Sequence, residues 1–372
     1  MRNQKCAESI LVSRRCLVRA AAFSATVGVS QFSLAKPAVA QRGSVRFADF
    51  VAVGRCEWEE FKRRFLAPDG RIIDTGNGDC SHSEGQGWGL LFAVAFNDRP
   101  AFESILAWTI ATLRRPSDYL HAWRYQPNLP FRVADWNNAT DGDLFIACAL
   151  WRAARRWGCA EHATLARRIA GDMLRLLVRT LGAHTVLLPG AEGFDFADSV
   201  TVNPSYYAFP MLAELAEAVP SPLWSQLSAD GQKLIDAGRF GFWRLPPDWL
   251  RVGRDGSLEP HPHWPPRFSY DAIRVPLYLA WSGGRCREAQ DAFVSFWARN
   301  ANPPAWVDLV TGARAQYRAP PGMAAVARVA SVPREQKIDV PLDLPAVRAS
   351  PDYYSAALIL LSRLACQERY AA

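Results

Sequence analysis

Three acidic residues lie in segments whose composition suits a binding site. Glu84 lies in the run Ser-Glu-Gly-Gln-Gly (83–87), Asp141 lies in the polar run 135–143, and Asp271 lies three residues before Arg274. Glycine lets the backbone approach a ligand closely. Carboxyl groups there can transfer protons or bind the hydroxyls of a ligand. These three residues are therefore candidates for acid–base chemistry or polar recognition.

Each of the three also has a purely structural interpretation. The positive end of a helix dipole would stabilise Glu84 if a helix begins beside it. Asp141 or Thr140 could be the N-cap of the apolar helix that follows. Asp271 and Arg274 have the spacing of a local ion pair, which is worth only about 0.2–0.5 kcal/mol. The residues taken singly leave both interpretations open.

Helical periodicity dominates the part of the chain that must position these residues. Apolar residues recur at intervals of three and four in residues 90–96, 102–113, 144–157, 163–181 and 356–364. Clusters of Gly, Pro and Asn separate these stretches, and the longest, at 246–266, is expected to be a surface loop. Roughly a dozen helical stretches fit between residues 44 and 370, with no linker between them. We therefore expect one all-α domain over residues 41–372.

The tryptophans point to a carbohydrate ligand. All 14 lie after residue 40, and several fall in predicted loops: Trp88, Trp136, Trp249, Trp264 and Trp306. Aromatic rings cover the C–H faces of a sugar, while carboxylates and amides bind its hydroxyls. The tryptophans in helical stretches are expected to pack in the core. We expect Trp88 and Trp136 to line a binding groove, with Trp249 or Trp264.

The first 40 residues have the pattern of an export signal. Arg14, Arg15 and Arg19 precede a weakly apolar stretch, and Ala38-Val39-Ala40 forms a small-x-small cleavage site. The twin arginines resemble a twin-arginine export motif, and an ordinary basic signal sequence is the alternative. We therefore expect a periplasmic or secreted protein after cleavage near Ala40. No later stretch has the roughly 20 apolar residues that a membrane span requires.

Charge and cysteine content exclude several other classes. After residue 40 the chain has 37 Lys and Arg against 35 Asp and Glu, so nucleic acid is not an expected partner. The six later cysteines are scattered and have no neighbouring histidines at metal spacing, so we expect no metal site. Disulfides are expected to be few, and Cys56 with Cys80 is the first pair to test.

The acidic segments together resemble glycoside hydrolase family 8. Residues 139–150, Ala-Thr-Asp-Gly-Asp-Leu-Phe-Ile-Ala-Cys-Ala-Leu, followed by Ala153 and Trp157, match that family's signature. Residues 83–87, 97–99, 203–206 and 270–275 match further segments in the same order. Within the family, the chain is most similar to the periplasmic endoglucanases that accompany bacterial cellulose synthase. The resemblance covers about residues 56 to 364 and implies an (α/α)6 barrel of six inner and six outer helices.

The resemblance also implies a role for each acidic residue. Glu84 would be the general acid and Asp271 the general base that activates water, as inverting hydrolysis requires. The implied substrate-binding residues are Asp141, Tyr206, Tyr270 and Arg274. At a helix N-terminus, Glu84 would need burial or a nearby carboxylate such as Asp141 to raise its pKa. Trp88 replaces a tyrosine that is frequent in the family, a change that could alter sugar stacking.

The implied activity is endo-acting hydrolysis of a β-1,4-glucan without metal or cofactor, in functional association with cellulose synthase. Family 8 also contains enzymes for chitosan, xylan and mixed-linkage glucan, and these remain alternatives. A polysaccharide-binding protein without activity is the alternative from another class. Such a protein would have lost Glu84 or Asp271, and both are present.

Overall fold

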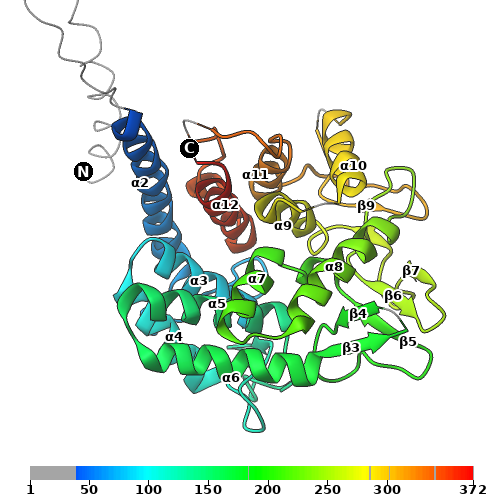
Figure 1. Ribbon diagram of the computed structural model, residues 1–372, viewed down its shortest axis with the longest axis horizontal. Coiled ribbons are helices and arrows are strands. Elements are labelled where there is room, and N and C mark those ends of the chain that lie inside the picture. Colours follow the sequence, from blue (N-terminus) through cyan, green and yellow to red (C-terminus); the bar gives the residue numbers. More distant parts are fainter. Residues whose placement is uncertain (1–38, 183, 285, 301, 339–340, 372) are drawn as a thin grey trace, which may run out of the picture. The chain divides into compact units, whose positions relative to one another are not determined.

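The computed structural model describes residues 39–182, 184–284, 286–300, 302–338 and 341–371 (Figure 1). Nearly all of the predicted export signal, residues 1–38, lies outside the described residues. The chain divides into two compact units, Met1–Val45 and Arg46–Ala372. The second unit contains every candidate site residue, and it is the unit described below.

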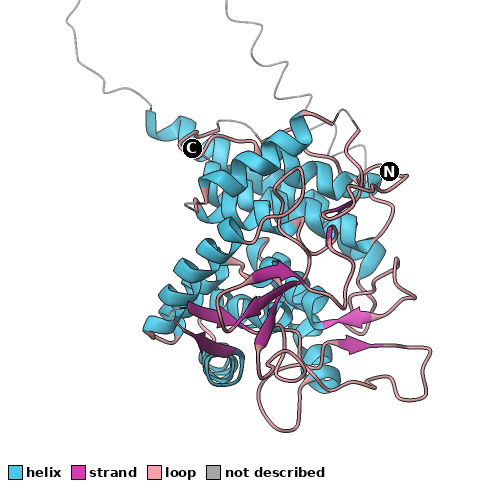
Figure 2. Ribbon diagram, turned by 90° about the vertical axis from the view of Figure 1, so that its right-hand side faces the viewer, coloured by secondary structure: helices cyan, strands magenta, loops and turns pink. Residues whose placement is uncertain are grey.

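Helices account for most of this unit (Figure 2). The α-helices among the described residues are α2 (Val39–Phe65), α3 (Ser83–Ala95), α4 (Arg99–Leu113), α5 (Thr140–Trp157), α6 (Ala160–Leu177), α7 (Phe209–Ala218), α8 (Pro222–Ala237), α9 (Arg274–Ser282), α10 (Arg287–Ala298), α11 (Pro321–Ala330) and α12 (Tyr353–Ala365). Short turns of other helix types are η1 (Pro204–Tyr206), η2 (Val347–Ala349) and η3 (Cys366–Tyr370).

The strands are short and pair in four antiparallel groups. They are β1 (Ser81–His82) with β2 (Arg124–Tyr125); β3 (Val178–Leu181) with β4 (His184–Leu187); β5 (Ser199–Val202), β6 (Leu250–Gly253) and β7 (Leu258–Pro260); and β8 (Arg267–Phe268) with β9 (Val307–Asp308). They lie in connections between helices, so the all-α class predicted from the sequence is confirmed.

Six helices form a closed inner ring. Contacts run from α3 to α5, α7, α9, α11 and α12, and α12 contacts α3 again. The outer helices α4, α6, α8 and α10 follow inner helices along the chain and pack on them. This alternation is the predicted (α/α)6 barrel. The helix α2 precedes α3 and is the fifth outer helix, since its Phe61 contacts Phe92 of α3 and Tyr353 of α12. The resemblance implied six outer helices, but between α11 and α12 the described residues form the short turn η2 in place of a sixth.

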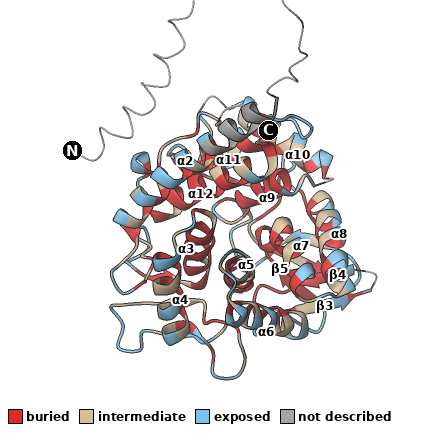
Figure 3. Cartoon of the chain, turned by 60° about the vertical axis from the view of Figure 1, so that its left-hand side comes forward, coloured by how far each residue is buried: buried red, intermediate tan, exposed pale blue. Residues whose placement is uncertain are grey.

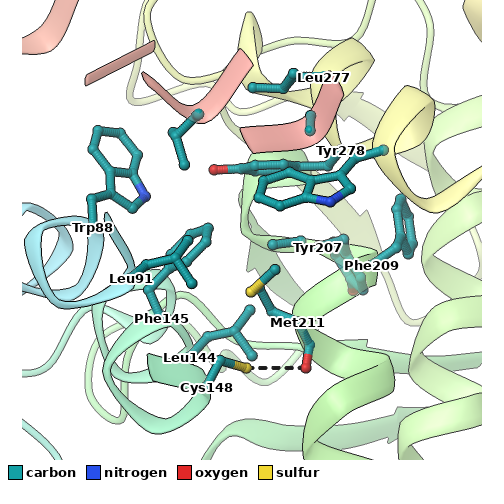
Figure 4. Packing of buried hydrophobic residues seen from close by; sticks show 14 of the residues in the cluster. Trp88, Leu91, Leu144, Phe145, Cys148, Tyr207, Phe209, Met211, Leu277 and Tyr278 are labelled. Carbon is teal, nitrogen blue, oxygen red and sulfur yellow. Dashed lines mark hydrogen bonds between the residues drawn. The ribbon is translucent and has the colours of Figure 1, made fainter. Parts of the chain in front are cut away.

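Burial follows the same division (Figure 3). Inner helices such as α3, α5 and α12 are buried on nearly every side, whereas outer helices bury one face. A helix with apolar residues all round must be enclosed by others, as the inner ring requires. In the barrel interior Phe145 packs on Trp88 and Tyr278, and the Cys148 thiol donates to the carbonyl of Met211 at 3.2 Å (Figure 4).

Two segments differ from the sequence-based expectation. Residues 178–181 were expected to extend a helix, but they form β3, because β-branched Val178 and Thr180 favour a strand that pairs with β4. The expected loop 246–266 contains β6 and β7, which pair with β5. Cys80, which the sequence analysis paired with Cys56 as a candidate disulfide, is a buried free thiol.

Candidate active site

Glu84 and Asp141 lie close together because the inner helices that carry them, α3 and α5, pack tightly against each other. Both residues lie in the first turn of their helices, α3 and α5. A Cβ atom on Gly142 would lie 2.6 Å from the Cβ of Ser83, and one on Gly87 would lie 2.8 Å from the Cβ of Phe145. Only glycine fits at either position. The glycines of the two motifs therefore serve helix packing, which sets the two carboxyls side by side.

The start of α5 is fixed by the residues on either side of Asp141. The Thr140 hydroxyl donates to the carbonyl of Leu188 at 2.6 Å. The carboxylate of Asp143, which is fully buried, accepts from the backbone N–H of His121 at 2.9 Å and from the Asn138 amide at 3.0 Å. With its neighbours engaged in this way, Asp141 is the acidic residue of the motif that reaches the carboxyl cluster.

His82 caps the start of α3, and Asp74 holds the His82 ring. His82 Nδ1 accepts the backbone N–H of Gly85 at 3.0 Å, and this bond leaves the proton of the neutral ring on Nε2. Nε2 lies 3.3 Å from the carboxylate of Asp74. This pair fixes the turn that carries Glu84.

Arg274 joins all three candidate acids. One guanidinium nitrogen, Nη1, donates to Glu84, and the other, Nη2, donates to Asp271 at 2.9 Å and lies 3.5 Å from Asp141. Nη2 also donates to the Ser205 hydroxyl at 2.6 Å. Arg274 is only 3% exposed, so these charges interact in a water-poor environment. Residues separated by almost 190 positions thus converge on one guanidinium.

Burial and like charge favour protonation of two of these acids. Burial raises the pKa of Glu84, against the lowering effect of Arg274. Burial, and then the charge of Glu84, raises the pKa of Asp141 well above its usual range. The Asp271 side chain is 31% exposed and forms an ion pair with Arg274.

Tyrosines surround the cluster as the sequence led us to expect. Tyr206, in η1, has its ring 5.9 Å from the Arg274 guanidinium carbon. The Tyr270 ring is 39% exposed, and its hydroxyl lies 3.3 Å from that of Tyr317. Tyr354, at the start of α12, donates its hydroxyl to the backbone carbonyl of Tyr270. Tyr206 therefore lies beside Arg274, and Tyr270 directly precedes Asp271 in the chain and contacts Tyr317 and Tyr354.

The prediction for Trp88 is wrong. Trp88 lies inside α3 rather than in a loop, and its side chain is fully buried against Phe145, Tyr353 and Tyr354 (Figure 4). A ring without exposed surface cannot stack on a sugar. Its neighbouring glycines suggested a loop, but they are packing positions within a helix. Trp88 instead packs near Arg274: its ring centroid lies 5.7 Å from the guanidinium carbon.

The other loop tryptophans are more accessible. Trp136 is 47% exposed in the segment after β2, the strand that pairs with β1 directly before α3. Trp249 and Trp264 stack on each other with ring centroids 4.7 Å apart, so one face of each ring contacts the other. The Trp249 ring also lies edge-on to Tyr206 at 6.4 Å.

The structure adds residues that sequence reasoning missed. Ser205, Tyr354 and the pair Asp74 and His82 contact the candidate acids or the segments that carry them. Asp248 binds the turn that carries Asp271. Ser205 had an available signal, since it lies within the segment 203–206 that resembles the family. His82 lies two residues before Glu84 and caps the same helix. Asp74, Tyr354 and Asp248 are brought in by tertiary contacts and have no local pattern.

An (α/α)6 barrel with a carboxyl cluster at the N-terminal ends of its inner helices places the chain among the glycoside hydrolases. Residues 34–368 match the glycosyl hydrolases family 8, and the chain belongs to that family.

Individual relatives agree with this assignment. The chain is 47% identical to a probable endoglucanase of Novacetimonas hansenii over 84% of this chain and 90% of that protein. It is 42% identical to an endoglucanase of Cellulomonas uda over 72% of this chain and 75% of that protein. Among solved structures, the endo-beta-1,4-glucanase CMCax of Acetobacter xylinum superposes with a TM-score of 0.80 at 45% identity, covering 85% of this chain and 98% of that chain.

Within the described part of the chain, no helix has the length and apolar character needed to cross a bilayer.

Proposed function

We propose that this chain is an endo-acting β-1,4-glucanase that hydrolyses cellulose or a related β-glucan with inversion of anomeric configuration. The observation that carries the proposal is the convergence of Glu84, Asp141 and Asp271 on Arg274. The names of the relatives, endoglucanase and endo-beta-1,4-glucanase, support the choice of substrate.

Glu84 acts as the general acid in this mechanism. Three carboxyls face one guanidinium, so the cluster would carry excess negative charge if all were ionised. Burial raises the pKa of Glu84 and that of Asp141, which keeps a proton available at the pair. Glu84 gives this proton to the glycosidic oxygen as the bond from that oxygen to the anomeric carbon breaks.

Asp271 acts as the general base. Its side chain is 31% exposed, which leaves room for water beside the carboxyl, whereas Glu84 is more deeply enclosed. Asp271 accepts a proton from water as the water oxygen bonds to the anomeric carbon from the opposite face. Glu84 ends ionised and Asp271 protonated, and exchange with solvent restores both. Asp141 and Tyr206 hold the sugar at the point of cleavage.

We also propose the cellular setting that the N-terminal sequence indicates. The export signal directs the protein to the periplasm or the outside of the cell, with cleavage near Ala40. There it would act on glucan chains in functional association with cellulose synthase. The relative from a Novacetimonas species and the sequence resemblance to synthase-associated enzymes support this setting.

The test is release of reducing ends from carboxymethylcellulose by the exported chain. We expect activity in the wild type and losses of at least about 10²-fold in E84Q and D271N, which keep the side-chain shape. Parallel assays on chitosan, xylan and mixed-linkage glucan check the alternative substrates. Binding of glucan without release of reducing ends would identify a binding protein and overturn the proposal.

A further inference from the structure

Asp248 holds the turn that carries Asp271. It lies between α8 and β6, and one of its carboxyl oxygens, Oδ1, accepts the backbone N–H of Ser269 at 3.0 Å and that of Ala272 at 2.8 Å. These two residues flank Tyr270 and Asp271 in the chain. The backbone N–H of Asp248 donates in turn to the carbonyl of Arg267 at 2.7 Å. Three hydrogen bonds of Asp248 therefore hold both ends of the turn in place.

The turn needs such support because it is not part of a regular element. Asp271 lies between β8 and α9, where the local backbone bonds are those from Ile273 to Ser269 and from Arg274 to Asp271, at 3.0 and 3.1 Å. Neither bond uses the N–H groups that Asp248 binds. Arg274 holds the carboxylate end of Asp271, whereas Asp248 holds its backbone end. The two contacts together define the direction of the Asp271 side chain.

Asp248 can accept its two hydrogen bonds from the turn while its carboxyl is protonated. Burial, followed by the charge of Asp271, raises the pKa of Asp248 to about 8. Near neutral pH its carboxyl therefore carries a proton most of the time. The two backbone N–H groups need only an acceptor oxygen, which a neutral carboxyl or a carboxamide supplies equally well. Asparagine should consequently replace Asp248 in this task, and alanine should not.

We propose that Asp248 is a positioning residue for the general base: its Oδ1 fixes the 269–272 turn so that Asp271 meets the attacking water. The proposal rests on the proposed role of Asp271 and assigns Asp248 no contact with substrate. An error of about 1 Å in the placement of a reacting group can cost about 10²-fold in rate. We therefore expect D248A to lower kcat on a long glucan about 10²-fold, with KM within about twofold of the wild type.

The conservative variant separates positioning from charge. D248N keeps an oxygen at the Oδ1 position and the same volume, so its kcat should remain within about threefold of the wild type. D248S keeps a hydroxyl too short to reach both N–H groups, and we expect a loss between those of D248N and D248A. D248S also provides the measurement if D248A does not fold.

A substrate with a reactive leaving group shows whether a variant is defective in proton donation or in activation of water. β-Cellobiosyl fluoride needs little proton donation to the leaving group but still needs an activated water. The loss in E84Q should therefore shrink on the fluoride, whereas the losses in D271N and D248A should be the same on the fluoride and on glucan. The matched control is D255A: Asp255 Oδ1 also accepts two hydrogen bonds, from the backbone N–H and the hydroxyl of Ser257 at 3.0 and 2.6 Å, in the exposed turn between β6 and β7.

The outcomes distinguish this proposal from the proposed function. If D271N is inactive while D248A or D248S matches the wild type, Asp248 does not position the base. If D248N is as impaired as D248A, or if D255A loses as much kcat as D248A, the hydrogen bonds from Asp248 to the turn are not the cause of the loss. If D271N itself remains active on both substrates, the role of Asp271 is wrong, whatever Asp248 does.

Discussion

Gly142 and Ser83 pack so closely that a hydrogen atom is the only side chain that fits at Gly142. A Cβ at that position would lie 2.6 Å from the Cβ of Ser83 and 2.7 Å from its carbonyl carbon. Because Ser83 precedes Glu84 and Gly142 follows Asp141, the same contact sets the separation of the two carboxyls. Fold stability and acid chemistry therefore depend on one glycine.

The first prediction is that G142A destabilises the protein and lowers activity together. Backbone atoms cannot move aside as a flexible side chain can, so α3 and α5 must separate. Overpacking of this kind costs about 1–3 kcal/mol. We expect a lower urea midpoint and a reduced kcat in the same variant, measured by circular dichroism and by release of reducing ends.

G171A is the matched control for this substitution. Gly171 also lies within a helix, α6, and a Cβ there would meet no atom within 4 Å. Replacing a helical glycine by alanine in open space should stabilise the fold by about 0.5–1 kcal/mol. Equal effects of G142A and G171A would show that the close contact has no consequence for stability.

A second prediction concerns the alkaline limb of the activity profile. Glu84 must be protonated to act as the acid, and burial raises its pKa above the ordinary range of a glutamate. Activity on glucan should therefore persist above the pH at which an exposed glutamate ionises, and should fall as pH rises through the raised pKa.

The pH dependence of kcat/KM on a soluble cello-oligosaccharide measures this limb. On β-cellobiosyl fluoride the limb should weaken, because fluoride leaves with little help from an acid. E84Q should show no limb on the fluoride. A wild-type limb that is identical on both substrates would mean that a group other than the acid controls it.

The third prediction is that W136A weakens substrate binding without affecting the fold. Trp136 is 47% exposed, so its removal opens no cavity in the core. An aromatic contact with a sugar ring worth about 1 kcal/mol corresponds to about a fivefold increase in KM on a long glucan. F242A, which removes an aromatic ring that is 84% exposed on another loop, is the control and should leave KM unchanged. An unchanged KM in W136A would remove Trp136 from the groove.

The sequence was informative where the chemistry is encoded locally. Glu84, Asp141 and Asp271 each lie beside a helix start within a polar segment, and the barrel joins these starts at one end. Helical periodicity likewise predicted an all-α domain, whereas the arrangement of its helices in an (α/α)6 barrel was implied by the resemblance to family 8.

The features of the site that the sequence did not predict depend on contacts between distant parts of the chain. Trp88 was misplaced because glycine-rich sequence is typical of loops, whereas these glycines permit close helix packing. Asp248 follows two prolines and has the appearance of an ordinary turn residue. Its partners are 21 and 24 positions away, so only the folded chain reveals its role.

The fourth prediction follows from the raised pKa of Asp248. Its pKa is about 8 in the fold and 3.8 in its ordinary state, so the folded protein binds the proton more tightly than the unfolded chain does. The contribution of Asp248 to stability therefore falls as pH rises from about 4 to about 8, and then levels off. D248N does not titrate, so its stability relative to the wild type should increase between pH 5 and pH 9.

Urea unfolding of both proteins across this range measures the difference. D308N is the control, since neighbouring hydrogen bonds lower the pKa of Asp308. Its contribution changes only below the ordinary pKa of an aspartate, so the difference between D308N and the wild type should be flat from pH 5 to pH 9. A flat difference for D248N as well would show that Asp248 is ionised throughout.

The fifth prediction concerns the stereochemistry of cleavage. An inverting enzyme must hold water between its base and the sugar, which requires carboxyls roughly 6.5–9.5 Å apart, whereas a retaining pair is about 5–5.5 Å apart. Glu84 and Asp271 bind different nitrogens of the Arg274 guanidinium, and we predict that their carboxyls have the wider spacing. Proton NMR of the first product from a cello-oligosaccharide should show the α-anomer before mutarotation. Initial release of the β-anomer would mean that Asp271 attacks the sugar directly instead of activating water.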